Sequence, residues 1–154
     1  MSQFKNIKSG LNINMSLGIA AFVLSGYATA QLGDVAPTVT LEKSTYASGE
    51  NILVNFSNGP GNKGDWIAVY AKGVVPGSGI FTELWYYSNG KREAGGNGAS
   101  EGTVVFDSAS DNPENTEVDW PLADGIYDVY FMCCEEYDVL AGPVALTIDS
   151  AGGG

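Results

Sequence analysis

After residue 31 the chain consists of short runs of β-branched and aromatic residues, separated by Gly, Asn, Asp and Pro. The runs recur at a spacing of roughly 8 to 15 residues, which is typical of an all-β sandwich. No window in this part of the chain keeps the period of an amphipathic helix. We therefore predict an antiparallel β-sandwich of about seven strands. The predicted strands cover residues 38–43, 51–57, 65–71, 82–88, 102–106, 125–133 and 139–148.

Alternation within the runs indicates which side chains face the core. In the second run Ile52, Val54 and Phe56 share one face, because successive side chains of a strand point to opposite sides. The last run is interrupted by Gly142 and Pro143. Since proline has no N–H to donate to a neighbouring strand, we expect the last strand to bulge or to switch sheets there.

The first thirty residues have the three parts of a secretory signal peptide. Lys5 and Lys8 give a positive start, and residues 13–24 form a short apolar run. Residues 28–30 (Ala-Thr-Ala) form a small-x-small cleavage site, so we expect the mature chain to begin at Gln31. A membrane anchor is the alternative, but the apolar run is shorter than the roughly 20 residues of a spanning helix. The expected organisation is a cleavable signal peptide over 1–30, an extended segment over 31–37, the sandwich over 38–149 and a flexible Gly-rich tail over 150–154.

Such a signal predicts a secreted protein, located in the periplasm, at the cell surface or outside the cell, with no membrane insertion after cleavage. The chain has 18 acidic and seven basic residues, and two of the seven, Lys5 and Lys8, leave with the signal peptide. This balance argues against nucleic acid and against anionic membrane surfaces, both of which attract basic proteins.

The chain contains no histidine. It therefore lacks the usual general base at neutral pH and the commonest ligand of zinc, copper and iron. Two carboxylates can catalyse glycoside hydrolysis, but such enzymes need a long cleft that a domain of this size seldom encloses. We therefore predict that the protein is not an enzyme.

Three motifs occur in order along the mature chain. Residues 44–50 read S-x-Y-x-x-G-E, residues 65–70 read D-W-I-A-V-Y, and residues 125–141 read G-x-Y followed by Y-x-V-L-A. With these motifs the chain resembles a family of bacterial extracellular immunoglobulin-like modules found beside secreted phosphoesterases and nucleases, and it is more distantly similar to SKICH domains. The resemblance implies an immunoglobulin- or fibronectin type III-like sandwich that accompanies a catalytic domain or mediates binding.

An aromatic cluster marks the fourth predicted strand. Trp85 and Tyr87 share one face of that strand and Leu84 and Tyr86 share the other, so one pair must lie outside the core or under a loop. Exposed Trp and Tyr side chains stack on sugar rings and also form protein interfaces, whereas the alternative is plain core and edge packing. Trp66 is expected in the core. The predicted ligand- or partner-binding residues are Trp85, Tyr87, Phe81 and Tyr137.

Residues 107–124 form an acidic stretch that offers oxygen ligands for calcium. The first candidate ligands are Asp111, Glu114 and Asp119. The stretch has no EF-hand pattern, and a solvated acidic loop is the alternative. Calcium is therefore a candidate cofactor, and no other cofactor is expected.

Cys133 and Cys134 are the only cysteines of the chain. In an exported protein they should be oxidised, but neighbouring residues cannot close a long cross-linked loop. Three states are open: a vicinal disulfide, bonds to another chain, or one buried and one exposed thiol. We favour the vicinal disulfide.

Two functions fit these features. The first is a secreted binding module that recognises an extracellular glycan or a protein partner. The alternative is a structural subunit of an extracellular filament, coat or adhesin. Such a subunit would assemble by strand pairing, with residues 31–38 as the pairing segment, or by intermolecular disulfides.

Overall fold

The computed structural model describes residues 34–110, 120–134 and 136–151. The predicted signal peptide, the candidate calcium ligands Asp111, Glu114 and Asp119, and residues 152–154 of the predicted tail lie outside the described residues. Within the described ranges, no helix has the length and hydrophobicity required to span a bilayer. The described strands are β1 (Thr38–Leu41), β2 (Thr45–Tyr46), β3 (Ile52–Ser57), β4 (Trp66–Ala71), β5 (Leu84–Tyr87), β6 (Gly102–Phe106), β7 (Gly125–Cys133) and β8 (Asp138–Ile148).

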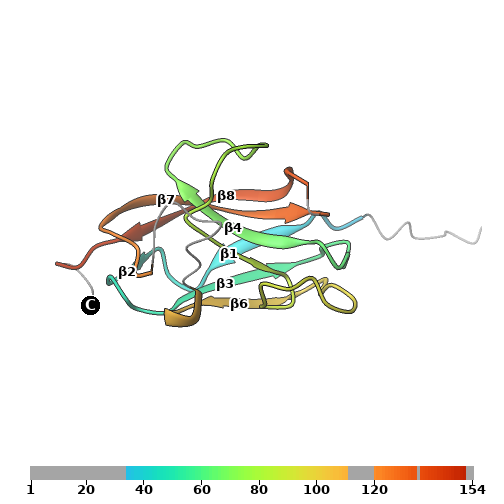
Figure 1. The fold of residues 1–154 in the computed structure, drawn as a ribbon, viewed down its shortest axis with the longest axis horizontal. Helices are drawn as coiled ribbons and strands as arrows, with labels where there is room; N and C mark the ends of the chain where they lie inside the picture. The colour runs from blue at the N-terminus through green and yellow to red at the C-terminus, as the bar shows by residue number, and fades with distance from the viewer. Residues whose placement is uncertain (1–33, 111–119, 135, 152–154) are drawn as a thin grey trace, which may run out of the picture. The chain divides into compact units, whose positions relative to one another are not determined.

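The strands form two sheets that face each other, as predicted for an all-β sandwich (Figure 1). One sheet has the order β1-β3-β6 and the other has the order β2-β8-β7-β4-β5. Neighbouring strands are antiparallel except β2 and β8, which are parallel, with Thr45 opposite Thr147. β2 was not predicted, because two residues are too few for an alternating pattern to be recognised. A short 3₁₀ helix at Ser108–Ser110 follows β6.

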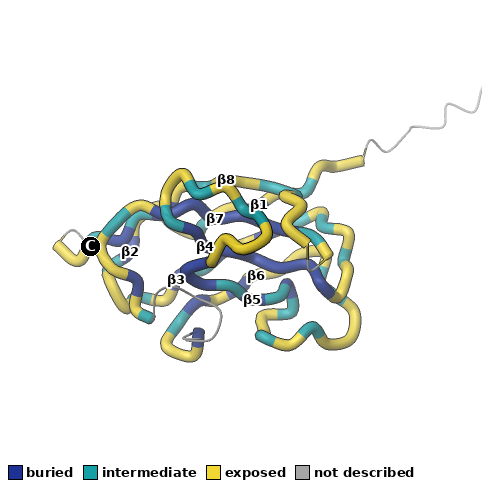
Figure 2. The backbone as a smooth tube through the Cα atoms, turned by 45° about the horizontal axis from the view of Figure 1, so that its top comes forward, coloured by how far each residue is buried: buried dark blue, intermediate teal, exposed yellow. Residues whose placement is uncertain are grey.

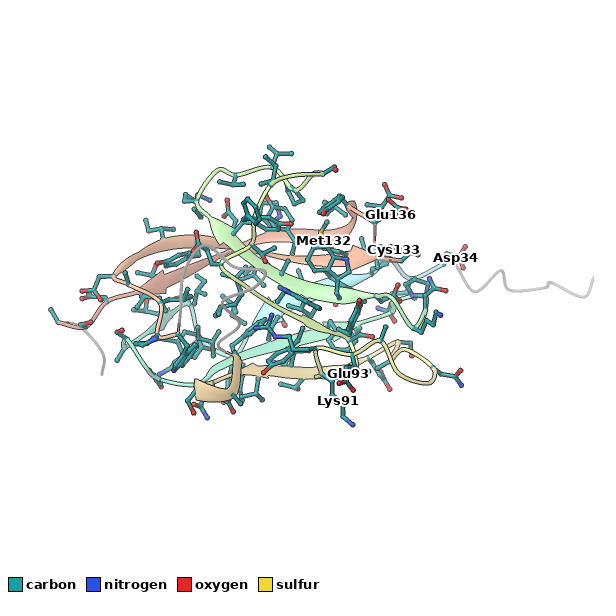
Figure 3. The ribbon with its side chains drawn as sticks, viewed as in Figure 1. Asp34, Lys91, Glu93, Met132, Cys133 and Glu136 are labelled. Atoms are coloured by element: carbon teal, nitrogen blue, oxygen red, sulfur yellow. A yellow bond between two sulfur atoms is a disulfide. The ribbon has the colours of Figure 1, made fainter. Side chains whose placement is uncertain are left out.

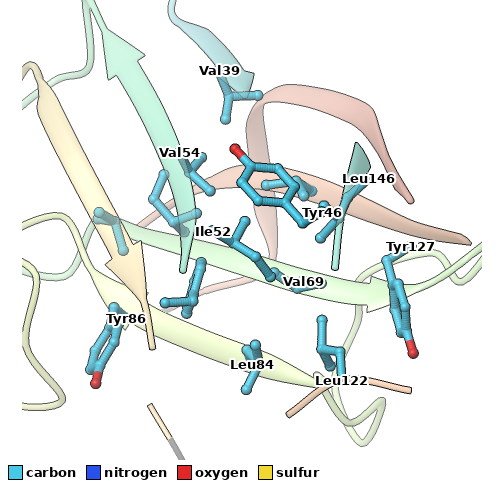
Figure 4. Close-up of a cluster of buried hydrophobic side chains, with 14 of the residues drawn as sticks. Val39, Tyr46, Ile52, Val54, Val69, Leu84, Tyr86, Leu122, Tyr127 and Leu146 are labelled. Atoms are coloured by element: carbon cyan, nitrogen blue, oxygen red, sulfur yellow. The ribbon is translucent and has the colours of Figure 1, made fainter. Parts of the chain in front are cut away.

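The main core lies between the two sheets. Ile52, Val54 and Phe56 are buried while their neighbours in β3 are more exposed, so the predicted core face is confirmed. Figure 4 shows Val69 of β4 and Leu84 of β5 in the same cluster as Ile52 and Val54. Burial follows the strands, whereas most of the connecting segments are exposed (Figure 2).

A second buried cluster covers the outer face of the five-stranded sheet. Its members are Trp66, Ala68, Tyr70, Tyr130 and Met132, with Val74, Trp85 and Tyr87 packed against them. Because the inner face of β4 already lies in the main core, this strand is buried on both sides. That explains why its sequence, WIAVYA, is a continuous apolar run and not an alternating one.

The pairing of β7 with β8 is irregular where the sequence predicted a bulge. Val129 pairs with Val144, but Phe131 pairs with Ala141, so the register shifts across Gly142 and Pro143. Gly142 has a φ of +109°, and a Cβ at this position would lie 2.6 Å from the carbonyl oxygen of Val129. Only glycine fits this close approach of two strands.

We expect Gly142→Ala to lower the free energy of unfolding by roughly 3 kcal/mol, because the methyl group adds a backbone collision to an unfavourable φ. Gly73→Ala is the matched control, since Gly73 also has a positive φ but has open space around it. The free energy of unfolding of the control should fall by only about 1 kcal/mol, because its alanine meets the unfavourable φ without a collision. Urea unfolding of both variants measures the difference, and equal losses would contradict the role of the collision.

Candidate functional site

The side chains of β5 alternate between the core and the outer face, as the sequence predicted. Leu84 and Tyr86 are buried between the sheets, whereas Trp85 and Tyr87 lie half-buried on the outer face. β5 is the edge strand of its sheet. The aromatic pair therefore lies at an accessible margin of the sandwich.

Trp85 and Tyr87 line a pocket of about 280 Å³. The pocket also includes Phe81, from the segment that connects β4 to β5, and Tyr137, which precedes β8. Phe81 is 59% exposed and Tyr137 is 39% exposed. The structure thus brings all four predicted binding residues to one pocket, although they come from distant parts of the sequence.

Trp66 is the ring that links these side chains. Its ring centroid lies 6.3 Å from that of Trp85 and 6.1 Å from that of Tyr137, in both cases edge to face. Trp85 in turn packs edge to face on Tyr87 at 5.2 Å. These distances are within the favourable range for aromatic pairs. The indole N–H of Trp66 donates a hydrogen bond to the backbone oxygen of Glu136 at 3.2 Å, which holds this ring in place.

Trp66 is only 8% exposed, as expected for a core residue, but it belongs to the outer cluster and not to the core between the sheets. It also lines the pocket, a role that sequence reasoning missed together with that of Ile80. The alternation of side chains along β4 could have predicted that Trp66 lies away from the core between the sheets, because Trp66 and Tyr70 lie on the face opposite Ile67 and Val69. What it did not show was that a second cluster would form on that face.

Arg92 supports the wall of the pocket from outside. Its guanidinium carbon lies 4.9 Å from the ring centroid of Trp85 and 5.0 Å from that of Tyr86, so the cation stacks on both rings. Arg92 also donates a hydrogen bond to the backbone oxygen of Ser110. Since Arg92 is not among the lining residues, it fixes Trp85 without placing a charge in the pocket.

Tyr70 lies on β4 in the same outer cluster as Trp66. Its side chain is fully buried, and its hydroxyl has no hydrogen-bond partner among the described residues. Burial raises the pKa of Tyr70 to about 12, with smaller contributions from Tyr137 and Tyr130. The hydroxyl is therefore neutral under ordinary conditions.

We expect the stability that depends on neutral Tyr70 to be complete below about pH 9, to fall as tyrosine in the unfolded chain ionises around pH 10, and to be lost as the pH rises toward 12. Tyr70→Phe should match or exceed the wild-type stability at neutral pH, because it removes a buried hydroxyl without a partner. It should also lose less stability than the wild type between about pH 10 and 12.

Urea unfolding at a series of pH values tests this expectation. The difference between the two proteins should be constant up to about pH 9, which is the internal control for the substitution itself. If the free energies of unfolding of wild type and Tyr70→Phe differ by the same amount at every pH up to 12, the raised pKa of Tyr70 is contradicted.

Cys133, which lies at the end of β7 (Figure 3), forms a vicinal disulfide with Cys134, as predicted. The side-chain amide of Asn62 points at both sulfur atoms, with Nδ2 3.3 Å from Cys134 Sγ and 3.6 Å from Cys133 Sγ. The backbone N–H of Glu136 donates to the carbonyl oxygen of Cys133 at 3.0 Å, so the disulfide begins the turn that carries Tyr137 into the pocket.

Comparisons with protein-family models, with curated proteins and with solved structures find no match to this chain. The immunoglobulin-like resemblance and the calcium site therefore remain predictions. The function has to be argued from the geometry of the aromatic pocket.

Proposed function

We propose that this chain is a secreted, non-catalytic binding module that holds a small, uncharged sugar unit of an extracellular glycan in the aromatic pocket. The lining of the pocket is the observation that carries the proposal. Among the described residues that line it, five are aromatic and none carries a charge. Aromatic faces stack on the apolar faces of sugar rings, and an uncharged lining favours an uncharged ligand.

The size of the pocket limits the ligand. Its volume of about 280 Å³ lies just below the range of roughly 300 to 1,000 Å³ that is usual for small-molecule sites. A pocket of this size suits one sugar ring at the end of a chain or branch and not a long stretch of polysaccharide. The exposure of Phe81 and Tyr137 leaves the mouth open for the rest of the glycan.

The aromatic rings of the pocket are preorganised, which favours a role in ligand binding over a role in packing alone. The edge-to-face contacts of Trp66 with Trp85 and Tyr137 hold the rings in position before a ligand arrives. Rings that are already ordered lose little conformational entropy on binding. Hydroxyl groups of Thr82, Tyr87 and Tyr137 on the lining residues provide polar atoms that can bind sugar hydroxyls.

The immunoglobulin-like assignment is part of the same proposal. It is supported by Tyr127, near the start of β7, whose hydroxyl donates to the backbone oxygen of Ala123 at 2.8 Å. This contact is similar to the tyrosine corner of immunoglobulin-like sandwiches. Modules of this type present their binding residues on loops and sheet margins, which is where Phe81 and Trp85 lie.

We expect the protein to bind at least one oligosaccharide on a glycan array, and we expect Trp85→Ala to weaken that binding at least tenfold, or about 1.4 kcal/mol. Phe81→Ala should weaken it as well, and this variant should fold normally because the side chain is largely exposed. Binding to the selected oligosaccharide is measured by calorimetry, and the change in total tryptophan fluorescence is a second readout.

Ile126→Ala is the matched control, because Ile126 is an exposed apolar residue of β7 outside the pocket. It should leave the affinity unchanged. Equal affinities of wild type, Phe81→Ala and Trp85→Ala would contradict the proposed site. Large species in light scattering, together with no glycan binding, would instead favour the structural subunit as the function of this chain.

A further inference from the structure

A second group of chemically active side chains lies beside the disulfide. Asp65, which directly precedes β4, and Asn62, in the loop before it, face Cys133 and Cys134. The two sulfur atoms and a carboxylate oxygen of Asp65 lie within 4.8 Å of one another. Three potential metal ligands from two segments of the chain therefore converge on one point.

Asp65 is fully buried, and its two oxygen atoms have different surroundings. Oδ2 accepts a hydrogen bond from the backbone N–H of Asn62 at 2.8 Å. Oδ1 lies 4.0 Å from Cys134 Sγ. A disulfide sulfur has no proton to donate, so this neighbour becomes a partner for Oδ1 only when the disulfide is opened. A buried carboxylate is stabilised by a hydrogen-bond donor or by a cation.

The sulfur atoms are accessible to reagents. Cys134 is exposed and Cys133 is partly buried, whereas Asp65 lies beneath them. A thiol in solution can therefore reach Cys134, while the buried carboxylate stays fixed by its position before β4. The site has one fixed ligand and two that change with oxidation state.

We propose that Cys133 and Cys134, once reduced, form with Asp65 a binding site for a thiophilic divalent cation such as Zn²⁺ or Cd²⁺. In the first step a dithiol reductant transfers two electrons and two protons to the disulfide. The S–S bond of the protein breaks, two thiols form, and the reductant closes its own disulfide. In the second step the cation binds both sulfur atoms and displaces their two protons to solvent.

The donor set selects the class of metal. Two thiolates and one carboxylate suit zinc-like cations, whereas calcium and magnesium take oxygen ligands. In a tetrahedral site, each sulfur ligand lies about 2.3 Å from the metal ion. Two such sulfur atoms are then about 4 Å, or slightly less, from each other. The distance of 4.0 Å between Cys134 Sγ and Asp65 Oδ1 is similar to this separation between two ligand atoms of one tetrahedral ion. The exposure of Cys134 leaves room for a water molecule as the fourth ligand.

This inference does not rest on the proposed glycan binding, because it uses none of the lining residues of the aromatic pocket. In the disulfide form the sulfur atoms are bonded to each other and no thiolate is available. Oxidation state therefore decides whether the metal binds.

The test is a titration of the purified protein with Cd²⁺, before and after reduction by dithiothreitol and its anaerobic removal. The reduced protein should bind one Cd²⁺ per chain, with the ultraviolet absorption of cadmium–thiolate bonds. The disulfide form should bind at least about 100-fold more weakly. Equal binding by both forms would overturn the proposal.

Asp65→Asn tests the third ligand and should weaken Cd²⁺ binding by the reduced protein at least about tenfold. Asp124→Asn is the matched control, because this exposed carboxylate directly precedes β7, at the opposite end of the strand from Cys133, and its loss should leave affinity unchanged. A folded Asp65→Asn variant that binds within twofold of the wild type would overturn the three-ligand site.

If circular dichroism shows that Asp65→Asn does not fold, the ¹¹³Cd chemical shift of the reduced wild type decides the question. A shift in the range of mixed sulfur and oxygen ligands supports the site if the side-chain carboxyl ¹³C resonance of Asp65 also moves on addition of Cd²⁺. An unchanged carboxyl resonance means that water supplies the oxygen, and it overturns the three-ligand site. A shift that indicates sulfur ligands alone overturns it.

Discussion

The burial of β4 on both faces is the constraint on which the rest of the structure depends. Its inner residues, Ile67 and Val69, belong to the core that joins the two sheets. Its outer residues, Trp66 and Tyr70, need a cover of their own, because large aromatic side chains are rarely left in water on a sheet. Neighbouring residues of β5 and β7, together with Val74 from the segment that follows β4, supply that cover. The pocket forms where the cover is incomplete.

The local features of this fold could be predicted because they depend on neighbouring residues. A period of two places Ile52, Val54 and Phe56 in the core, and the same rule separates Trp85 and Tyr87 from their neighbours. Adjacent cysteines similarly limited the choices for the disulfide. These inferences need no knowledge of which strands pair.

The remaining features depend on contacts between distant segments, which no local pattern contains. The pocket requires the approach of Phe81 and Tyr137 to Trp66 across more than one strand. From the sequence, Asp65 was predicted only as the first residue of a strand. Nothing near it in the sequence indicated that it would lie under Cys134. The two-residue strand β2 was too short to predict, and its pairing with β8 depends on the course of the whole chain.

That short parallel pair has a mechanical consequence. Thr147 donates its N–H to the carbonyl of Ser44 and Asp149 donates to that of Tyr46, so two hydrogen bonds join the β2 segment to the end of β8. In a parallel pair, tension applied at residue 44 and residue 149 acts along the strands and strains both bonds at once. The ring of Tyr46 is buried in the core, so sliding β2 past β8 would also pull an aromatic side chain out of it. The two hydrogen bonds and the buried ring of Tyr46 together therefore resist stretching of the chain between residues 44 and 149.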